Sequence, residues 1–417
     1  MSNKKIQKFD LFKLHVPEED KDPRWGWIRA SGKYLAPYVY SLIKELTDNY
    51  GTNNAAKQIK ELIPRLSIQT ILDYFWSKNQ RFPLVFLEAL SKQFKNNLEI
   101  KQKIQDEVDI LSISRHDSKP IKAVKELNLI LCKIAGAHAA DGSLWGEYNY
   151  QLIDSDKLSV IEFTKWLEDV FGYKIKAKLH KKSNAYTFCF KSKILGRYLK
   201  NFLGFPIGKK TNIVKEPEII KNSNLEFRKA FALGVLTFDG SVDIRGKAMI
   251  QSKSKNLILD LYDILKDENI LISFNNKPDK KGRYTLQFSN FEPKLLGYFD
   301  KNSRKYQRLY ELVHGFEGSA KNLKEAKNAF DLAYPITHLT LVTFSDILRI
   351  SDNREPFSYQ DALLLLKDKN IHISDTTLKY YIKILSNNKI LRMVKEKPFK
   401  VFKLNNNIKG WKVPKSR

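Results

Sequence analysis

Two short runs of apolar and small residues stand out along the chain, at residues 131–142 and 231–240. Their composition predicts buried helices, and each run ends in Asp-Gly, at Asp141 and at Asp239. A glycine directly after a helix is the usual left-handed stop signal. Each stop leaves a carboxylate in the last turn, where the helix dipole is negative. Two such carboxylates repel each other unless a cation lies between them, so the pattern indicates a metal site.

The two runs belong to an internal repeat. The acids are 239 − 141 = 98 residues apart, and the same offset relates residues 186–190 to residues 284–288. Gln151 and Gln251 each open a polar stretch that leads into a predicted amphipathic helix, at residues 157–171 and 255–267. We therefore expect one unit of motif helix, two strands, helix and two strands to occur twice.

Before this repeat, the pattern predicts helices at residues 34–49, 55–62 and 68–76, with Ser67 as the N-cap of the third. Helix, short turn and capped helix is the helix-turn-helix pattern, whose second helix enters a major groove. Gln69, Thr70 and Asp73 would then face the bases. An ordinary three-helix bundle is an equal alternative. Residues 95–124 are predicted to be a helical spacer.

After the repeat, helices are predicted at residues 360–367 and 377–385, the second capped by Ser374, followed by a hairpin at residues 390–404. This order is the outline of a winged helix, which binds either DNA or proteins. The DNA-binding interpretation assigns polar and basic side chains to the reading helix and the wing: Thr377, Lys379, Lys383, Lys395 and Lys397.

Residues 134–142 and 232–240 resemble the two motifs of the LAGLIDADG (dodecapeptide, DOD-type) homing endonucleases in their single-chain form, and the resemblance covers roughly residues 125–315. It implies an α+β fold of two αββαββα halves, with the motif helices side by side and a saddle of strands over duplex DNA. Gly136 and Ala140 give the first helix a small contact face, whereas Gly234 is followed by the bulky Phe238.

With the flanking segments, four domains are expected. They are an all-α helix-turn-helix-like domain with its linker at 1–124, the two halves at 125–222 and 223–330, and a winged-helix-like domain at 331–417. Because both motifs lie in one chain, we expect a monomer.

The charge of the chain identifies the class of partner. Lys and Arg exceed Asp and Glu by 27, which favours double-stranded DNA over a small-molecule substrate. The two cysteines, Cys132 and Cys189, lie in apolar patterns, so buried free thiols and a reducing cytoplasm are expected. No apolar run is long enough for a membrane span.

Within the repeat, residues 174–180 alternate strictly between apolar and basic residues, which predicts a strand with one exposed cationic side. Where the resemblance places the DNA saddle, that side would contact phosphates, although alternating lysines are also typical of a solvated face. Predicted DNA-binding residues of the first half are Lys174, Lys176, Lys178 and His180. Those of the second half are Arg245, Lys247, Ser273, Asn275, Lys277 and Arg283.

The chemistry implied by the resemblance is metal-dependent hydrolysis of phosphodiesters in DNA, with Asp141 and Asp239 as ligands of Mg²⁺. Gln151 and Gln251 would orient water, or serve only as polar strand residues. Lys210 ends a segment, 206–210, in which the family brings a lysine toward the cleavage centre; an ordinary loop lysine is as well supported. His138 is expected in the core. Two alternatives remain: an inactive DNA-binding transcription regulator on the same scaffold, and an RNA-splicing maturase.

Overall fold

The computed structural model describes residues 7–16, 19–20, 27–76, 81–113, 119–146, 148–180, 185–243, 247–289, 292–333, 344–351, 355–368, 373–396 and 399–414. It is an α+β structure with four antiparallel sheets among these residues. The chain divides into two compact units, which are described separately. The first comprises residues 1–239, 251–264 and 277–284, and the second comprises residues 240–250, 265–276 and 285–417.

The N-terminal segment of the first unit combines helices with a sheet, so the prediction that it is all-α was wrong. The helices are α1 (Leu35–Tyr50), α2 (Thr52–Leu62), α3 (Ile68–Trp76), α4 (Leu84–Ser91) and α5 (Asn97–Glu107). The sheet has the order β2-β1-β3-β4, with β1 at Ile28–Ser31, β2 at Phe82–Pro83, β3 at Ile110–Ile113 and β4 at Ile121–Lys122. The predicted cap of α3 is confirmed, because the Thr70 amide donates to Ser67 Oγ at 3.0 Å.

A buried carboxylate ties the start of the chain to α8 (Lys193–Arg197). Asp20 is only 1% exposed, forms an ion pair with the Lys193 ammonium, and lies 3.2 Å from Nη2 of Arg197. Burial alone raises the pKa of Asp20, but hydrogen bonds from His15 and Lys193 lower it to about 2. The carboxylate is therefore charged in the folded protein and holds two buried cations.

We expect Asp20→Asn to lower the free energy of unfolding by about 3 kcal/mol or more, because it leaves buried cations without their partner. Urea denaturation measures this change. Asp10→Asn is the matched control, since Asp10 pairs with Lys101 in a partly exposed position and should contribute at most about 1 kcal/mol. Equal effects of the two substitutions would contradict this account of Asp20.

The pH dependence of that stability has a definite sign. The pKa of Asp20 lies below its ordinary value of 3.8, so its contribution is complete above that pH and is lost as the pH falls toward about 2. The difference in stability between the wild type and Asp20→Asn should therefore shrink in acid.

The two repeats contain matching elements. The first has α6 (Leu129–Ala140), β5 (Gly142–Trp145), β6 (Asn149–Asp154), α7 (Lys157–Phe171), β7 (Lys178–His180) and β8 (Ala185–Lys191). The second has α10 (Leu225–Asp239), β9 (Gly240–Val242), β10 (Ala248–Ser252), α11 (Lys255–Asp267), β11 (Ile272–Asn275) and β12 (Tyr284–Phe288). The strand orders, β5-β6-β8-β7 and β9-β10-β12-β11, are the same, and so the expected unit does occur twice.

The first repeat's sheet has one buried and one exposed face. Tyr150, Leu152 and Phe188 are buried, whereas alternate residues such as Cys189 are exposed. The expectation that Cys189 is buried was therefore wrong, because its neighbours Phe188 and Phe190 fill the core side of β8.

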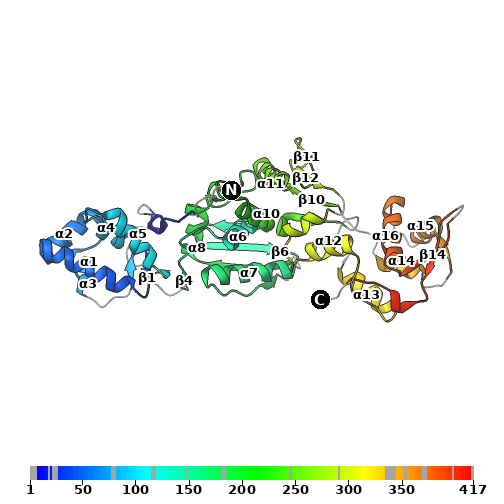
Figure 1. Ribbon diagram of the computed structural model, residues 1–417, viewed down its shortest axis with the longest axis horizontal. Helices are drawn as coiled ribbons and strands as arrows, with labels where there is room; N and C mark the ends of the chain where they lie inside the picture. Colours follow the sequence, from blue (N-terminus) through cyan, green and yellow to red (C-terminus); the bar gives the residue numbers. More distant parts are fainter. Residues whose placement is uncertain are drawn as a thin grey trace. The chain divides into compact units, whose positions relative to one another are not determined.

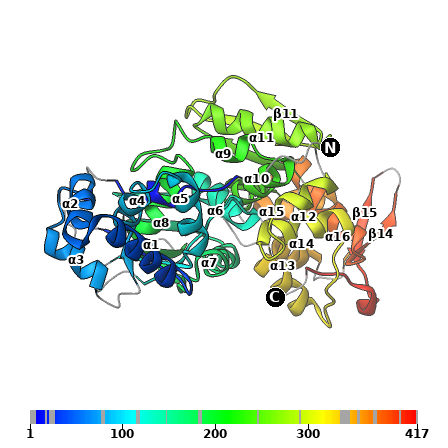
Figure 2. The same ribbon diagram turned by 60° about the vertical axis from the view of Figure 1, so that its left-hand side comes forward.

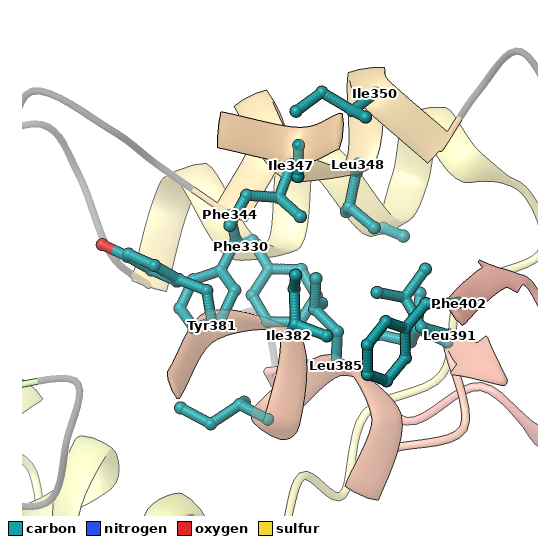
Figure 3. Close-up of a cluster of buried hydrophobic side chains, with 14 of the residues drawn as sticks. Phe330, Phe344, Ile347, Leu348, Ile350, Tyr381, Ile382, Leu385, Leu391 and Phe402 are labelled. Carbon is teal, nitrogen blue, oxygen red and sulfur yellow. The ribbon is translucent and has the colours of Figure 1, made fainter. Parts of the chain in front are cut away.

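In the second unit, the repeat is followed by η3 (Pro293–Tyr298), α12 (Arg304–His314) and α13 (Leu323–Ala333). The C-terminal elements are α14 (Phe344–Ser351), β13 (Phe357–Ser358), α15 (Tyr359–Asp368), α16 (Asp375–Asn387), β14 (Leu391–Lys395) and β15 (Val401–Leu404). Figure 3 shows their common core, in which the Phe344 and Tyr381 rings meet edge to face at 4.4 Å. The predicted Ser374 cap is confirmed, since Ser374 Oγ accepts from the Thr377 amide at 3.2 Å. Among the described residues, no helix has the length and apolar character needed to cross a bilayer.

Candidate metal centre

Helices α6 and α10 lie side by side in both ribbon views (Figures 1 and 2). A Cβ added to Gly136 would overlap the Phe231 carbonyl oxygen and lie 2.8 Å from the Val235 amide nitrogen. A Cβ added to Gly234 would overlap the carbonyl oxygen of Lys133 in the same way. The contact is therefore reciprocal: Lys133 corresponds to Phe231, and Gly136 to Gly234, at the offset of 98 residues. Only glycine permits this close approach of the two backbones.

Phe238 does not prevent this contact. Its ring is buried and meets the Phe163 ring of α7 edge to face, with centroids 6.0 Å apart. The bulky side chain is thus accommodated against α7.

The paired helices end at the two acids. Asp141 follows α6 directly and Asp239 is the last residue of α10, and both are half-buried. Gly142 and Gly240 begin strands β5 and β9 and do not have positive φ, so the predicted left-handed stops were wrong. Glycine is required at position 142 for a steric reason instead, because a Cβ there would lie only 2.6 Å from Nδ1 of His138.

The positively charged ammonium group of Lys210 lies near both acids. Its ammonium donates to the carbonyl oxygens of Ala139 at 2.6 Å and Ala140 at 2.7 Å, which lie in the last turn of α6. Burial lowers the pKa of Lys210 to about 8, although the charges of Asp239 and Asp141 act in the opposite direction. One ammonium group thus interacts electrostatically with both carboxylates, one at the end of α6 and one at the end of α10.

The residues present fit a hard divalent cation. Two half-buried carboxylates offer oxygen ligands at the paired helix ends, and oxygen is the donor that Mg²⁺ prefers. Among the described residues, no group of three or more His, Cys, Asp or Glu side chains is arranged to hold a metal ion. A cation here would therefore take its remaining ligands from water and substrate phosphate.

The two predicted glutamines are not equivalent in the structure. Gln151 pairs with Ser143 across β5 and β6, and its Nε2 donates to Thr187 Oγ1 at 3.4 Å. The corresponding partner of Ser241 is Met249, so Gln251 lies two residues farther along β10. Gln151 and Gln251, which were predicted to have the same role, therefore do not occupy equivalent positions in the two repeats.

The cationic strand is shorter than predicted, because residues 174–177 precede β7 without joining it. Lys174 instead pairs with Glu168 at 3.1 Å. Lys176 and Lys178 are exposed, and Lys178 lies opposite Thr187. His180 ends β7 and pairs with Ala185 through the backbone.

In the second repeat, Ser273 and Asn275 are exposed on β11 and Lys277 is exposed just beyond it. Arg283 pairs with Asp279 at 2.7 Å, and the half-buried Lys247 donates its amide to Asp243. Arg245 lies outside the described residues.

The predicted reading helices use some of their polar groups internally. Gln69 Nε2 donates to Asp73 Oδ1 at 3.1 Å, and Lys379 pairs with Asp375 at 2.5 Å. Thr70 and Thr377 each bond to the serine that caps their helix. Lys383 and Lys395 are exposed, and Lys397 lies outside the described residues.

Several polar and aromatic residues on the exposed face of the first sheet were missed from sequence. Trp145 is 55% exposed, and Asn149 lies directly opposite it. The period-two alternation of residues 142–145 and 185–191 was the available signal. The missed residues of this face are Ser143, Trp145, Asn149, Thr187, Cys189 and Lys191.

Comparison with solved structures finds similar folds over part of the chain. A mesophilic variant of the homing endonuclease I-DmoI matches 39% of this chain and 88% of its own, with 21% identity and a TM-score of 0.31. The homing endonuclease I-WcaI bound to its DNA recognition sequence matches 45% and 87%, with 11% identity and a TM-score of 0.30. The N-terminal LAGLIDADG domain of DUF199/WhiA matches 41% and 80%, with 10% identity and a TM-score of 0.29.

No protein-family model matches the chain, and no curated protein matches it either.

Proposed function

We propose that the chain is a divalent-metal-dependent endonuclease of the LAGLIDADG homing type, which hydrolyses phosphodiesters at a specific site in double-stranded DNA. The observation that carries the proposal is the reciprocal contact of Gly136 with Gly234. This contact aligns two helices that each end in an acid, and Lys210 lies within electrostatic range of both acids.

In this proposal, Asp141 and Asp239 would hold Mg²⁺, which would supply an activated water and relieve charge on the phosphate. By fixing the position of the cation, Asp141 and Asp239 would also orient the phosphodiester that binds to it. Lys210, with a pKa of about 8, either stabilises the developing negative charge or gives its proton to the leaving 3′ oxygen. The Gln151 amide orients water on the exposed sheet face.

In this proposal, each repeat contributes DNA contacts from the exposed face of its own sheet. Neutral polar groups such as Gln151 and Asn149 suit base edges, and Lys178 and Lys191 suit phosphates. The N-terminal segment acts as a helix-turn-helix module and the C-terminal segment as a winged helix, with boundaries near residues 124, 222 and 330. A single chain provides both motifs, so the active species is a monomer.

Incubation with a randomised duplex library, with and without Mg²⁺, tests the proposal. We expect the wild-type chain to enrich one family of cut sequences only when Mg²⁺ is present. Binding without any cut would instead support a DNA-binding regulator.

Lys210→Met should lower the cleavage rate by about 10²–10³-fold, because it removes a charge aimed at the reacting phosphate. Lys209→Met, which alters the exposed neighbouring lysine, is the matched control and should have little effect. A similar loss in both variants would contradict a specific role for Lys210.

The pH profile provides a second readout for the same residue. Since the pKa of Lys210 is about 8, its charge is lost as the pH rises through that value, and the wild-type rate should decline in that range. Lys210→Arg stays charged there, so the decline should disappear in any activity that this variant keeps.

A further inference from the structure

Two fully buried polar side chains lie beside Asp141 without a hydrogen-bond partner. His138 is 0% exposed and Tyr150 is 2% exposed. Within the described part of the chain, the two ring nitrogens of His138 form no hydrogen bond, and the Tyr150 hydroxyl forms none either. Buried polar groups are almost always satisfied, so a cluster of such groups calls for a physical reason.

The two polar groups converge on the residue that follows Asp141. An ideal Cβ on Gly142 would lie 2.6 Å from Nδ1 of His138 and 2.7 Å from the Tyr150 hydroxyl oxygen. Both atoms therefore lie next to the backbone of Gly142, the residue that follows Asp141 at the end of α6. The two rings are neighbours, with centroids 5.4 Å apart.

Aromatic packing fixes the direction of the Tyr150 hydroxyl. Its ring stacks on Phe190 at 4.8 Å and on Phe163 at 6.1 Å, and the His138 ring meets Phe205 edge to face at 4.5 Å. These apolar neighbours offer no acceptor, which leaves the hydroxyl available to the polar groups near Gly142.

Electrostatics connects the pair to the candidate metal centre. Burial and the charge of Asp141 raise the pKa of the Tyr150 hydroxyl well above its usual value. Burial and the charge of Lys210 lower the pKa of His138 well below its usual value. Tyr150 is therefore a neutral donor within electrostatic range of the Asp141 carboxylate.

The second repeat lacks this pair. At the offset of 98 residues, His138 corresponds to Leu236 and Tyr150 to Ala248, and both of these apolar residues are fully buried. The same strand order forms around them, so the fold does not require polar groups at these positions.

We propose that the Tyr150 hydroxyl, oriented by the His138 ring, is a positioning group that donates a hydrogen bond to the Asp141 carboxylate and so prepares it to bind a divalent cation. His138 donates from Nδ1 to the Tyr150 oxygen, and the Tyr150 hydroxyl hydrogen is directed to Asp141. Ligating carboxylates are commonly held by such outer hydrogen bonds. The inference rests on the proposed function. It implies that Asp141 receives an outer hydrogen bond that Asp239 does not receive from the equivalent positions of the second repeat.

The test compares two buried tyrosines of the first repeat in the full-length chain. Tyr150→Phe removes the unpartnered hydroxyl. Tyr198→Phe removes a hydroxyl that accepts from the Val124 amide at 2.9 Å and donates to the Val124 carbonyl at 3.0 Å. Binding of Mn²⁺ alone is measured by electron paramagnetic resonance, and the melting temperature is measured on the same samples.

Tyr150→Phe should weaken Mn²⁺ binding by about 10-fold or more without lowering the melting temperature. Tyr198→Phe should lower the melting temperature and leave Mn²⁺ affinity unchanged, because it breaks a satisfied buried hydrogen bond. Unchanged Mn²⁺ affinity in Tyr150→Phe, or a melting temperature lowered as much as in Tyr198→Phe, would overturn this inference alone. A wild-type chain that binds no Mn²⁺, or that binds it equally well after Asp141→Asn, would overturn the proposed metal centre as well.

Discussion

Replacing Asp239 with asparagine is expected to lower the rate of DNA cleavage by about 10³-fold or more, and Asp141→Asn should have a similar effect. In the proposed function each acid is a charged ligand of the cation that stabilises the transition state, a contribution of several kcal/mol, and each substitution removes one such ligand. Binding of DNA in the absence of divalent cations should be unchanged or tighter, since a negative charge near the phosphates is lost. Single-turnover cleavage and equilibrium binding measure the two effects separately.

The expected change in stability is small. An acid at the C-terminal end of a helix is disfavoured by the helix dipole and two nearby acids repel each other, but the Lys210 charge attracts both acids, so the melting temperature of the asparagine variants should change little. Asp169→Asn, which alters an exposed acid of α7, is the control and should affect neither cleavage nor melting. If Asp141→Asn or Asp239→Asn cleaved DNA at the wild-type rate, the assignment of that acid as a metal ligand would be wrong.

Gly136→Ala should lower the free energy of unfolding by about 3 kcal/mol and abolish cleavage, because the added methyl group overlaps the Phe231 carbonyl and forces α6 and α10 apart. Gly234→Ala meets the Lys133 carbonyl and should behave in the same way. Chemical denaturation gives the stability change, and cleavage measured well below the midpoint of unfolding separates loss of the site from loss of the fold.

Gly297→Ala is the matched control for these substitutions. Nothing lies within 4 Å of the added Cβ, and Gly297 does not have a positive φ, so alanine should be neutral there. If Gly136→Ala were as harmless as Gly297→Ala, the close contact of the two motif helices would be wrong.

The long periodic elements of the fold were predicted well from sequence. The predicted helices at residues 157–171, 255–267 and 68–76 match α7, α11 and α3 residue for residue. Each carries a sustained apolar stripe or a capping serine, and such local signals do not depend on distant residues. The repeat at an offset of 98 residues also predicted which glycines of α6 and α10 face each other.

The N-terminal sheet could not be predicted in this way. Its strands are two to four residues long, which is too short for a period to be recognised. They also pair across long stretches of chain, as Ile28 does with Ile113. The Asp20 ion pairs were missed for the same reason, because the partners Lys193 and Arg197 lie far away in sequence.

The errors within the site have local causes. Alternation at residues 174–180 predicted one long strand, but only residues 178–180 pair with β8, and Lys174 forms an ion pair with Glu168 of α7. The pairing of Gly240 with Ile250 sets the register of β10 and places Met249 where Gln151 lies in the first repeat. A shift of two residues keeps the same face of a strand, so the alternating pattern alone could not reveal it.

The most direct test of the paired-acid centre is the position of a bound cation. Crystals of the full-length chain with a DNA target selected from the library, grown with Mn²⁺, would locate the ion by its anomalous scattering. We predict Mn²⁺ in direct contact with carboxylate oxygens of both Asp141 and Asp239, beside the scissile phosphate. Mn²⁺ bound elsewhere, with the two acids turned away from each other, would contradict the proposed function.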